Sequence, residues 1–210
     1  MNVESLVANR LLAVKAVKLQ PAKPFTWASG WKSPIYCDNR KALSFPAVRS
    51  LVKVEIARII AEKYPDAEVI AGVATGAIAQ GALVADILGL PFCYVRSSKK
   101  DHGMENLVEG YLEEGKKVVV VEDLISTGGS SLKAVAALRD EKKANVLGMV
   151  AIFTYGFPVA EEAFRAAGVE LTTLSNYEAL LAYASETGYV NAEALATLRE
   201  WRKNPSEWEG

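Results

Sequence analysis

The chain has 210 residues, half of them hydrophobic, with a formal net charge of −1 and a pI of about 6.0. This length and apolar content suffice for the core of one sizeable domain, and the near-neutral charge argues against a protein that binds mainly nucleic-acid phosphates. The N-terminus lacks the basic-then-apolar pattern of a secretory signal, and no window approaches the roughly 18 apolar residues of a membrane span. The two cysteines, Cys37 and Cys93, have no disulfide or metal-ligand spacing and are expected to be reduced and buried. We therefore expect a cytoplasmic protein with neither a nucleic-acid nor a membrane partner.

Helices and strands are predicted to alternate along most of the chain. Two helices, at about residues 2–17 and 45–64, precede the first strand. Continuous apolar runs, typical of strands covered on both faces, then predict strands at residues 68–73, 92–95, 117–121, 146–153 and 170–174. Helical patterns are found at residues 77–88, 131–142 and 158–167, and the tail at 177–201 is helical in two pieces. This alternation favours an α/β fold with a central five-stranded, mainly parallel sheet and helices on both faces.

The connection between the second and third predicted strands breaks the alternation. Residues 96–106 are too polar and too rich in small side chains to pack as a helix, whereas residues 107–112 could pair as a strand. Four potential cations lie in the first part: Arg96, Lys99, Lys100 and His102, which is the only histidine of the chain. Long exposed connections in compact domains are usually functional lids or disordered inserts. We interpret the cations as a pyrophosphate site on a lid rather than as a solvated charge cluster.

The third predicted strand ends in an unusual run of side chains, Glu122-Asp123-Leu124-Ile125-Ser126-Thr127-Gly128-Gly129-Ser130. Ligands of parallel sheets bind beyond the carboxyl ends of the strands, where we expect Glu122 and Asp123 to lie. The backbone N–H groups of a glycine-rich turn, together with hydroxyls and a helix N-terminus, form an anion site over residues 126–130. The two carboxylates repel a phosphate but accept hydrogen bonds from sugar hydroxyls. The run therefore predicts a site for a ribose 5-phosphate.

Other interpretations of this glycine-rich run fit less well. A P-loop requires Gly-x-x-x-x-Gly-Lys-Ser/Thr, and Lys133 is misplaced relative to Gly128 and Gly129. The Gly-x-Gly-x-x-Gly fingerprint of dinucleotide sites is also absent. The bland alternative, a strand with an acidic turn and a serine-capped helix, is disfavoured by the order of apolar, acidic and Ser-Thr-Gly-Gly-Ser residues. Residues 72–77 remain open between a phosphate loop and a tight glycine turn.

Three stretches carry a resemblance to a known family. Residues 118–130 resemble the phosphoribosyl pyrophosphate (PRPP) signature of type I phosphoribosyltransferases. Residues 25–40, Phe-Thr-Trp-Ala-Ser-Gly-Trp-Lys-Ser-Pro-Ile-Tyr-Cys-Asp-Asn-Arg, are similar to the N-terminal substrate segment of orotate phosphoribosyltransferases, and residues 96–103 to their mobile catalytic loop. The resemblance implies the type I fold with a small N-terminal hood. It further implies one domain over residues 1–210, with about residues 1–40 and the C-terminal tail forming the hood and base-binding region, and residues 96–110 forming the mobile loop.

The resemblance also implies a reaction: transfer of the ribose 5-phosphate of PRPP to orotate, giving orotidine 5′-monophosphate and pyrophosphate in pyrimidine synthesis. It implies Mg²⁺ held through PRPP and water, with no direct protein ligand, and a homodimer whose catalytic loop is shared across subunits. Catalytic roles fall to Lys100, His102 and Asp123. PRPP binding falls to Arg96, Lys100, His102, Thr75, Gly76, Glu122, Asp123, Leu124, Ile125, Ser126, Thr127, Gly128, Gly129 and Ser130. Orotate binding falls to Ser126 and Tyr36.

The sequence departs from the family pattern at three cations. Ser97 stands where many members have a second lysine, Ala28 where some have a substrate-contacting lysine, and residues 154–156 where some have an arginine. Two rival functions therefore stay open: transfer to a purine or another base, and a non-enzymatic regulator that senses PRPP. The cations of the connection at residues 96–106, which we call the arm, and the absence of a basic module disfavour the regulator.

Overall fold

The computed structural model describes residues 2–27, 29–98 and 106–209. Its central sheet has six strands in the order β10-β9-β8-β5-β6-β7, and every pair is parallel except β6 with β7. The strands are β5 (Val69–Val73), β6 (Phe92–Val95), β7 (Val108–Glu109), β8 (Lys117–Ile125), β9 (Asn145–Thr154) and β10 (Leu171–Asn176). The predicted α/β fold with a mainly parallel sheet is confirmed. The strand count is six rather than five, because the segment after the arm pairs as the short antiparallel edge strand β7.

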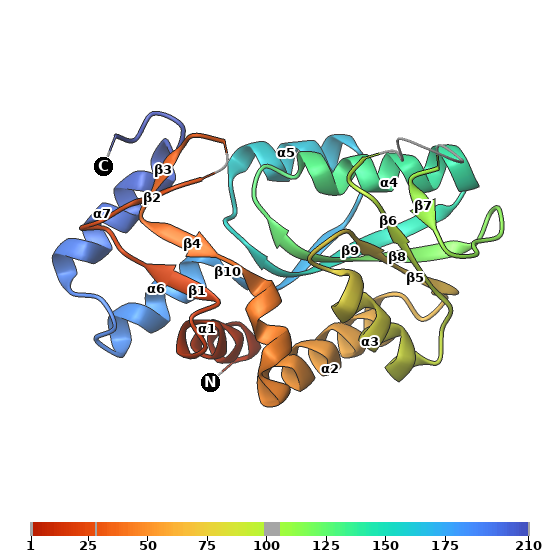
Figure 1. The fold of residues 1–210 in the computed structure, drawn as a ribbon, viewed down its shortest axis with the longest axis horizontal. Helices are drawn as coiled ribbons and strands as arrows, with labels where there is room; N and C mark the ends of the chain where they lie inside the picture. Colours follow the sequence, from red (N-terminus) through yellow and green to blue (C-terminus); the bar gives the residue numbers. More distant parts are fainter. Residues whose placement is uncertain (1, 28, 99–105, 210) are drawn as a thin grey trace.

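Helices cover both faces of this sheet (Figure 1). Helices α1 (Val3–Ala13), α2 (Pro46–Lys63) and α3 (Ile78–Leu88) lie on one face, and α4 (Gly129–Lys142) and α5 (Pro158–Ala166) lie on the other. Successive residues of β8 enter opposite cores: Val119 and Val121 pack with the first set of helices, and Val118 and Val120 with the second. This alternation explains why the strand is apolar at every position. None of the helices in the described chain is long and apolar enough to cross a membrane.

Short strands near the N-terminus pack against the C-terminal helices on the left of Figure 1. Strand β1 (Val17–Leu19) pairs antiparallel with β4 (Ile35–Cys37), and β2 (Phe25–Thr26) pairs with β3 (Lys32–Ser33). They are followed by the 3₁₀ helix η1 (Asn39–Ser44), and the chain closes with α6 (Tyr177–Glu186) and α7 (Ala192–Lys203). Because α7 contacts both the N-terminal strands and the turn after β9, it joins the two ends of the chain.

Helix α7 makes this junction through two adjacent side chains. The fully buried Trp201 donates its indole N–H to the Lys32 carbonyl oxygen over 3.1 Å. Its ring lies 5.6 Å from that of Trp27 and 6.0 Å from that of Tyr155. Arg202 donates to the carbonyl oxygens of Tyr155 and Gly156 over 3.2 and 2.8 Å. The end of β9 and the β2–β3 hairpin are therefore held against the same helix.

Two expectations about element boundaries were wrong. The first helix ends at Ala13 rather than 17, because Lys15 adopts a left-handed conformation (φ 57°) and Val17 opens β1. Strand β8 continues to Ile125, so Glu122 and Asp123 lie within it rather than beyond it. The pairing of β5 with β8 nevertheless stops at Val121, so Asp123 lies past the end of β5, while β8 stays paired with β9 up to Ile125. The β1–β4 strands went unpredicted because runs of two or three residues show no periodicity.

Candidate functional site

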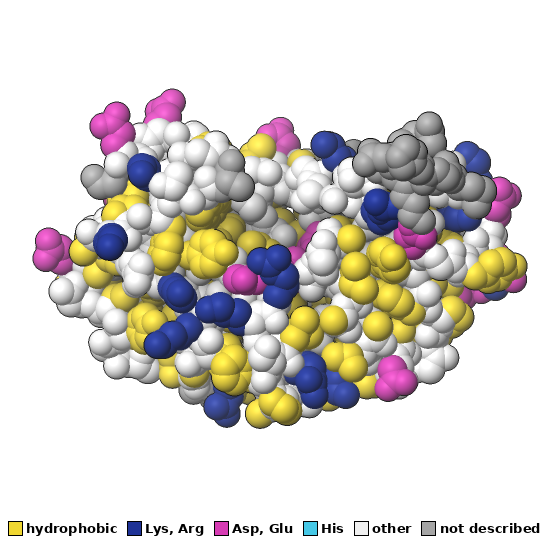
Figure 2. Space-filling view, in the orientation of Figure 1, with side chains coloured by type: hydrophobic (Ala, Val, Ile, Leu, Met, Phe, Trp, Pro, Cys, Tyr) yellow, Lys and Arg dark blue, Asp and Glu magenta, His cyan; other side chains and the backbone are white. Residues whose placement is uncertain are grey.

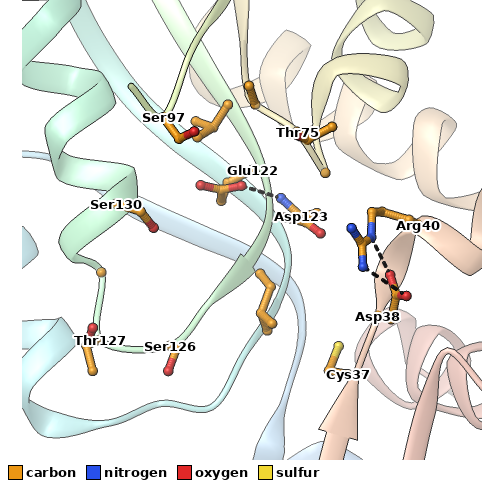
Figure 3. A pocket seen from close by; sticks show the side chains of 15 residues that line it. Cys37, Asp38, Arg40, Thr75, Ser97, Glu122, Asp123, Ser126, Thr127 and Ser130 are labelled. Atoms are coloured by element: carbon orange, nitrogen blue, oxygen red, sulfur yellow. Dashed lines mark hydrogen bonds and ion pairs between the residues drawn. The ribbon is translucent and has the colours of Figure 1, made fainter. Parts of the chain in front are cut away.

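A cavity of about 530 Å³ lies where β5 and β8 end. Its walls come from four parts of the chain: residues 37, 38 and 40, residues 73–76, Ser97, and residues 122–124, 126–128 and 130. Figure 3 shows the carboxylates of β8 between the hydroxyl-bearing turn on one side and an Asp38–Arg40 pair on the other. The site thus combines acids, hydroxyls and backbone donors in one space.

Most of the residues predicted to bind PRPP line this first cavity. They are Thr75, Gly76, Glu122, Asp123, Leu124, Ser126, Thr127, Gly128 and Ser130. Three others do not: Ile125 is fully buried in the core, and Gly129 and Arg96 line a neighbouring cavity. Lys100 and His102 lie outside the described residues.

The turn before α4 presents backbone N–H groups and hydroxyls to the first cavity. Helix α4 begins at Gly129, and its N-cap Gly128 has φ +81°, a conformation that favours glycine. A Cβ at Gly128 would also lie 3.0 Å from the Phe164 ring. No side chain of the described residues caps this helix, so the N–H groups of its first turn remain available to a ligand. Ser126, Thr127 and Ser130, whose side chains carry hydroxyls, line the same cavity (Figure 3).

Glu122 and Asp123 differ in how the protein holds them. The buried Glu122 carboxylate accepts hydrogen bonds from the Asp123 N–H over 2.9 Å and from the Ser131 hydroxyl over 2.8 Å. Burial raises the pKa of Glu122, and the charge of Asp123 raises it further. Burial also raises the pKa of the half-buried Asp123, and the Arg40 guanidinium opposes that rise. A ligand that donates hydrogen bonds to Asp123 would favour its ionised form.

Glycine at position 76 permits the close approach of two walls. A Cβ at Gly76 would fall on the Asp123 carboxylate group. The same turn contains a cis peptide bond between Ala74 and Thr75. The β5 turn and the β8 carboxylate therefore touch without room for a side chain between them.

Sequence reasoning assigned no role to three polar residues that follow β4. Asn39, only 2% exposed, donates its amide N–H to the Asp123 carbonyl oxygen over 2.6 Å and accepts from the Cys37 thiol. Asp38 and Arg40 form a bidentate ion pair at 2.7 and 3.1 Å on the cavity wall. In the sequence, the only indication of their role is the polar run Asp38-Asn39-Arg40 directly after an apolar segment. It lay inside the resembling stretch but had no periodicity of its own.

One of the two predictions about cysteine burial was wrong. Cys93 is buried as predicted, but Cys37 is only partly buried and lies on the cavity wall. Burial, together with the charges of Asp123 and Asp38, raises the pKa of the Cys37 thiol well above its usual value. The thiol is therefore protonated near neutral pH and serves as a hydrogen-bond donor.

A second cavity, of about 500 Å³, adjoins the first through Cys37, Leu124 and Ser126. Tyr36 and Ser126, the residues predicted to bind orotate, both line it. The remaining walls are Thr26 and the rings of Trp27 and Tyr155, so flat aromatic surfaces face the space where a planar ring would fit. Figure 2 shows hydrophobic side chains exposed in a hollow left of centre, over the region where Figure 1 draws β4. None of the described residues that line this cavity is charged.

A third cavity, of about 490 Å³, adjoins the first through Val73, Ala74, Ser97 and Ser130. Arg96 lines it, with its guanidinium 3.5 Å from Glu109. The chain returns to this place after the arm, where the N–H groups of Leu107 and Val108 donate to the Glu141 carboxylate. Both ends of the predicted arm are thus fixed at the third cavity.

Metal ligands are sparse in the described part of the chain. Among the described residues, no group of three or more His, Cys, Asp or Glu side chains could hold a metal ion. The acids of the first cavity supply hard oxygen donors, but too few for a cage made of protein alone.

Many known proteins are similar to this chain in sequence or in structure. Residues 48–156, just over half of the chain, match the family model of the phosphoribosyl transferase domain. The chain is 66% identical over 208 residues to the orotate phosphoribosyltransferase of Bacteroides fragilis, covering 99% of this chain and 98% of that relative. The solved orotate phosphoribosyltransferase of Aeropyrum pernix superposes with a TM-score of 0.76 at 28% identity, over 88% of this chain and 99% of that one. The orotate phosphoribosyltransferase of Mycobacterium tuberculosis, solved in complex with PRPP, superposes with a TM-score of 0.66 at 25% identity, over 85% of this chain and 98% of that one.

Proposed function

The chain belongs to the orotate phosphoribosyltransferases, and on that premise we propose that it transfers the ribose 5-phosphate of PRPP to orotate, releasing orotidine 5′-monophosphate and pyrophosphate. The observation that carries this function is the meeting of two unlike cavities at Leu124 and Ser126. One has the phosphate turn and two carboxylates, and the other has aromatic walls. The similarity to a relative solved in complex with PRPP supports PRPP as a substrate.

The first cavity binds and orients the sugar phosphate. The N–H groups at the start of α4 and the hydroxyls of residues 126–130 hold the 5-phosphate, while Asp123 accepts hydrogen bonds from ribose hydroxyls. This orientation directs the anomeric carbon toward the second cavity. Breaking its bond to pyrophosphate leaves positive charge on the ribose, and the ring nitrogen of the base forms the new bond. Asp123 lies where it can stabilise the charge that develops on the sugar.

We propose that Mg²⁺ accompanies PRPP in this site. Bound to phosphate oxygens and water, it would neutralise negative charge on the leaving pyrophosphate. The scarcity of carboxylate clusters among the described residues fits a metal that arrives with its ligand. Thr75 and Gly76 then bind phosphate oxygens through their backbone.

We also propose a division of labour along the chain. About residues 1–40 and the C-terminal tail form a hood over the base, within a single domain of residues 1–210. The packing of Trp201 against Trp27 and Tyr155, which both line the second cavity, supports this role. Residues 96–110 form a catalytic loop that supplies Arg96, Lys100 and His102 to a neighbouring subunit of a homodimer.

A substrate screen tests the function. Protein, Mg²⁺ and PRPP are mixed in turn with orotate, uracil, adenine, guanine and xanthine, and pyrophosphate release is followed. We expect release with orotate alone, because its carboxylate distinguishes it from the other four bases. An inert orotate beside a reactive purine would reassign the enzyme to another base. Release with none of the five would favour the PRPP sensor.

Mixed dimers test the shared loop. Lys100→Ala removes a cation of the loop, and Asp123→Asn removes a charge of the sugar site, so each homodimer should be nearly inactive. In a hybrid, one site receives an intact loop and intact carboxylates, while the other receives both lesions. Random re-association makes half of the dimers hybrids, so we expect about a quarter of wild-type activity from this statistic. Activity that stays at the level of the parents after verified subunit exchange would show that the loop serves its own subunit.

A further inference from the structure

Among the described residues, no charged side chain lines the second cavity, although the proposed substrate carries a negative charge. Orotate is a carboxylate at neutral pH, and burying a carboxylate against aromatic rings without a cation is costly. The residues described on the wall of this cavity offer hydroxyls, a thiol and rings, but no positive charge. A cation must therefore reach the cavity from a residue that does not itself form the wall.

Lys32 is placed to do so. Its ammonium donates to the Thr26 hydroxyl over 2.9 Å, and Thr26 lines the second cavity. The two residues face each other across the β2–β3 pair, so their side chains share one face of the hairpin. A threonine hydroxyl that accepts from lysine still has its proton to donate. The pair therefore offers an anion a charge and a hydrogen bond from one point.

The backbone of Lys32 is fixed from two directions. Its strand pairs with β2, and its carbonyl oxygen accepts from the indole of the fully buried Trp201. Trp201 also packs against Trp27 and Tyr155, which form walls of the same cavity. One buried ring thus sets the distance between the lysine and the aromatic walls. An exposed lysine on a flexible loop would have no such reference.

The charge of Lys32 is also uncommitted. Within the described residues its ammonium forms no ion pair, and its one hydrogen bond goes to a neutral hydroxyl. Arg40, the cation on the wall of the first cavity, is held instead by the bidentate pair with Asp38. Binding a carboxylate therefore costs Lys32 no existing ion pair, whereas Arg40 would have to weaken its ion pair with Asp38.

We propose that Lys32, with Thr26, binds the carboxylate of the base substrate and so sets the preference for an acidic pyrimidine. This inference rests on the proposed function. It assigns to this chain a cation for the second cavity although Ala28 and the turn at residues 154–156 carry none.

A charge series at position 32 tests the assignment. Lys32→Met keeps the length of the side chain and removes the charge, Lys32→Arg keeps the charge, and Lys32→Glu reverses it. We expect KM for orotate to rise about tenfold in the Met variant, as for a lost charge-assisted hydrogen bond, and further in the Glu variant. The Arg variant should stay within a few-fold of wild type, and KM for PRPP should be unchanged in all three.

Two other lysines serve as comparisons. Lys53→Met removes the same charge from helix α2, away from the residues that line the two cavities, and should leave both KM values unchanged. Lys18 lies opposite Tyr36 in the β1–β4 pair and is the rival cation. An orotate-specific rise in KM in Lys18→Met but not in Lys32→Met would overturn the proposal. So would equal rises for orotate and PRPP across the series.

The wild-type enzyme in the same assay separates the two levels of the argument. Wild type that is inactive with orotate would remove the proposed function itself. Wild type that is active, with an unchanged orotate KM in both Lys32→Met and Lys32→Glu, would remove only the role of Lys32.

Discussion

Gly76→Ala is expected to lower kcat/KM for PRPP by about 10- to 100-fold while leaving the fold intact. The added Cβ would fall on the Asp123 carboxylate, which must then rotate away from its place in the cavity. Because the displaced atoms are the end of a side chain rather than backbone, the core need not move. The loss equals roughly one charge-assisted hydrogen bond to the sugar, about 1.5–3 kcal/mol. Steady-state kinetics and a thermal unfolding curve on the same preparation measure both effects.

The matched comparison for Gly76→Ala is Gly115→Ala. Gly115 lies in an exposed turn where a Cβ would meet no atom within 4 Å, although its φ of +78° adds backbone strain. Gly115→Ala should therefore lose some stability and no activity, the reverse of the Gly76 variant. If Gly76→Ala retains wild-type kcat/KM for PRPP, then the position of the Asp123 carboxylate does not matter to the reaction.

The contrast between these glycines also shows which part of the site was readable from sequence. The run at residues 122–130 predicted a carboxylate and phosphate site because its order of apolar, acidic and small residues is local, and local order survives folding. The contact between Gly76 and Asp123 joins residues far apart in the chain, and nothing in either stretch states the distance. Composition predicted the turn, but only the parallel pairing of β5 with β8 brings it to the carboxylate.

The same distinction applies to the fold. Strands β5, β8 and β9 were predictable because both of their faces are largely buried and their apolar runs are continuous, whereas β6 and β10 were predicted although they are only partly buried. The β2–β3 hairpin was not, because two-residue strands gain their order from partners elsewhere, above all from Trp201. Asn39 was missed for a related reason, since its hydrogen bond spans 84 positions to the Asp123 carbonyl oxygen. Residues whose role depends on partners far away in the sequence leave no local pattern.

Trp201→Ala is expected to cost about 3–5 kcal/mol of the free energy of unfolding, the usual range for truncating a buried tryptophan. The ring is fully buried and lies within 5.6–6.0 Å of the rings of Trp27, Tyr155, Phe157 and Tyr177. Its removal also leaves the Lys32 carbonyl oxygen without its indole donor. Urea unfolding, read as a shift in the midpoint at constant slope, measures this loss.

Two tryptophan variants separate packing from position. Trp208 is only partly buried against the same core, so Trp208→Ala should cost clearly less than Trp201→Ala. Trp201→Phe keeps much of the ring but removes the N–H donor, and should cost about 1–2 kcal/mol from the unpaired carbonyl and the smaller volume. At a temperature where it remains folded, Trp201→Phe should raise KM for orotate more than KM for PRPP, because the indole fixes Lys32 and two walls of the second cavity but touches none of the first. Equal changes in the two KM values would mean that Trp201 stabilises the whole protein without positioning the base.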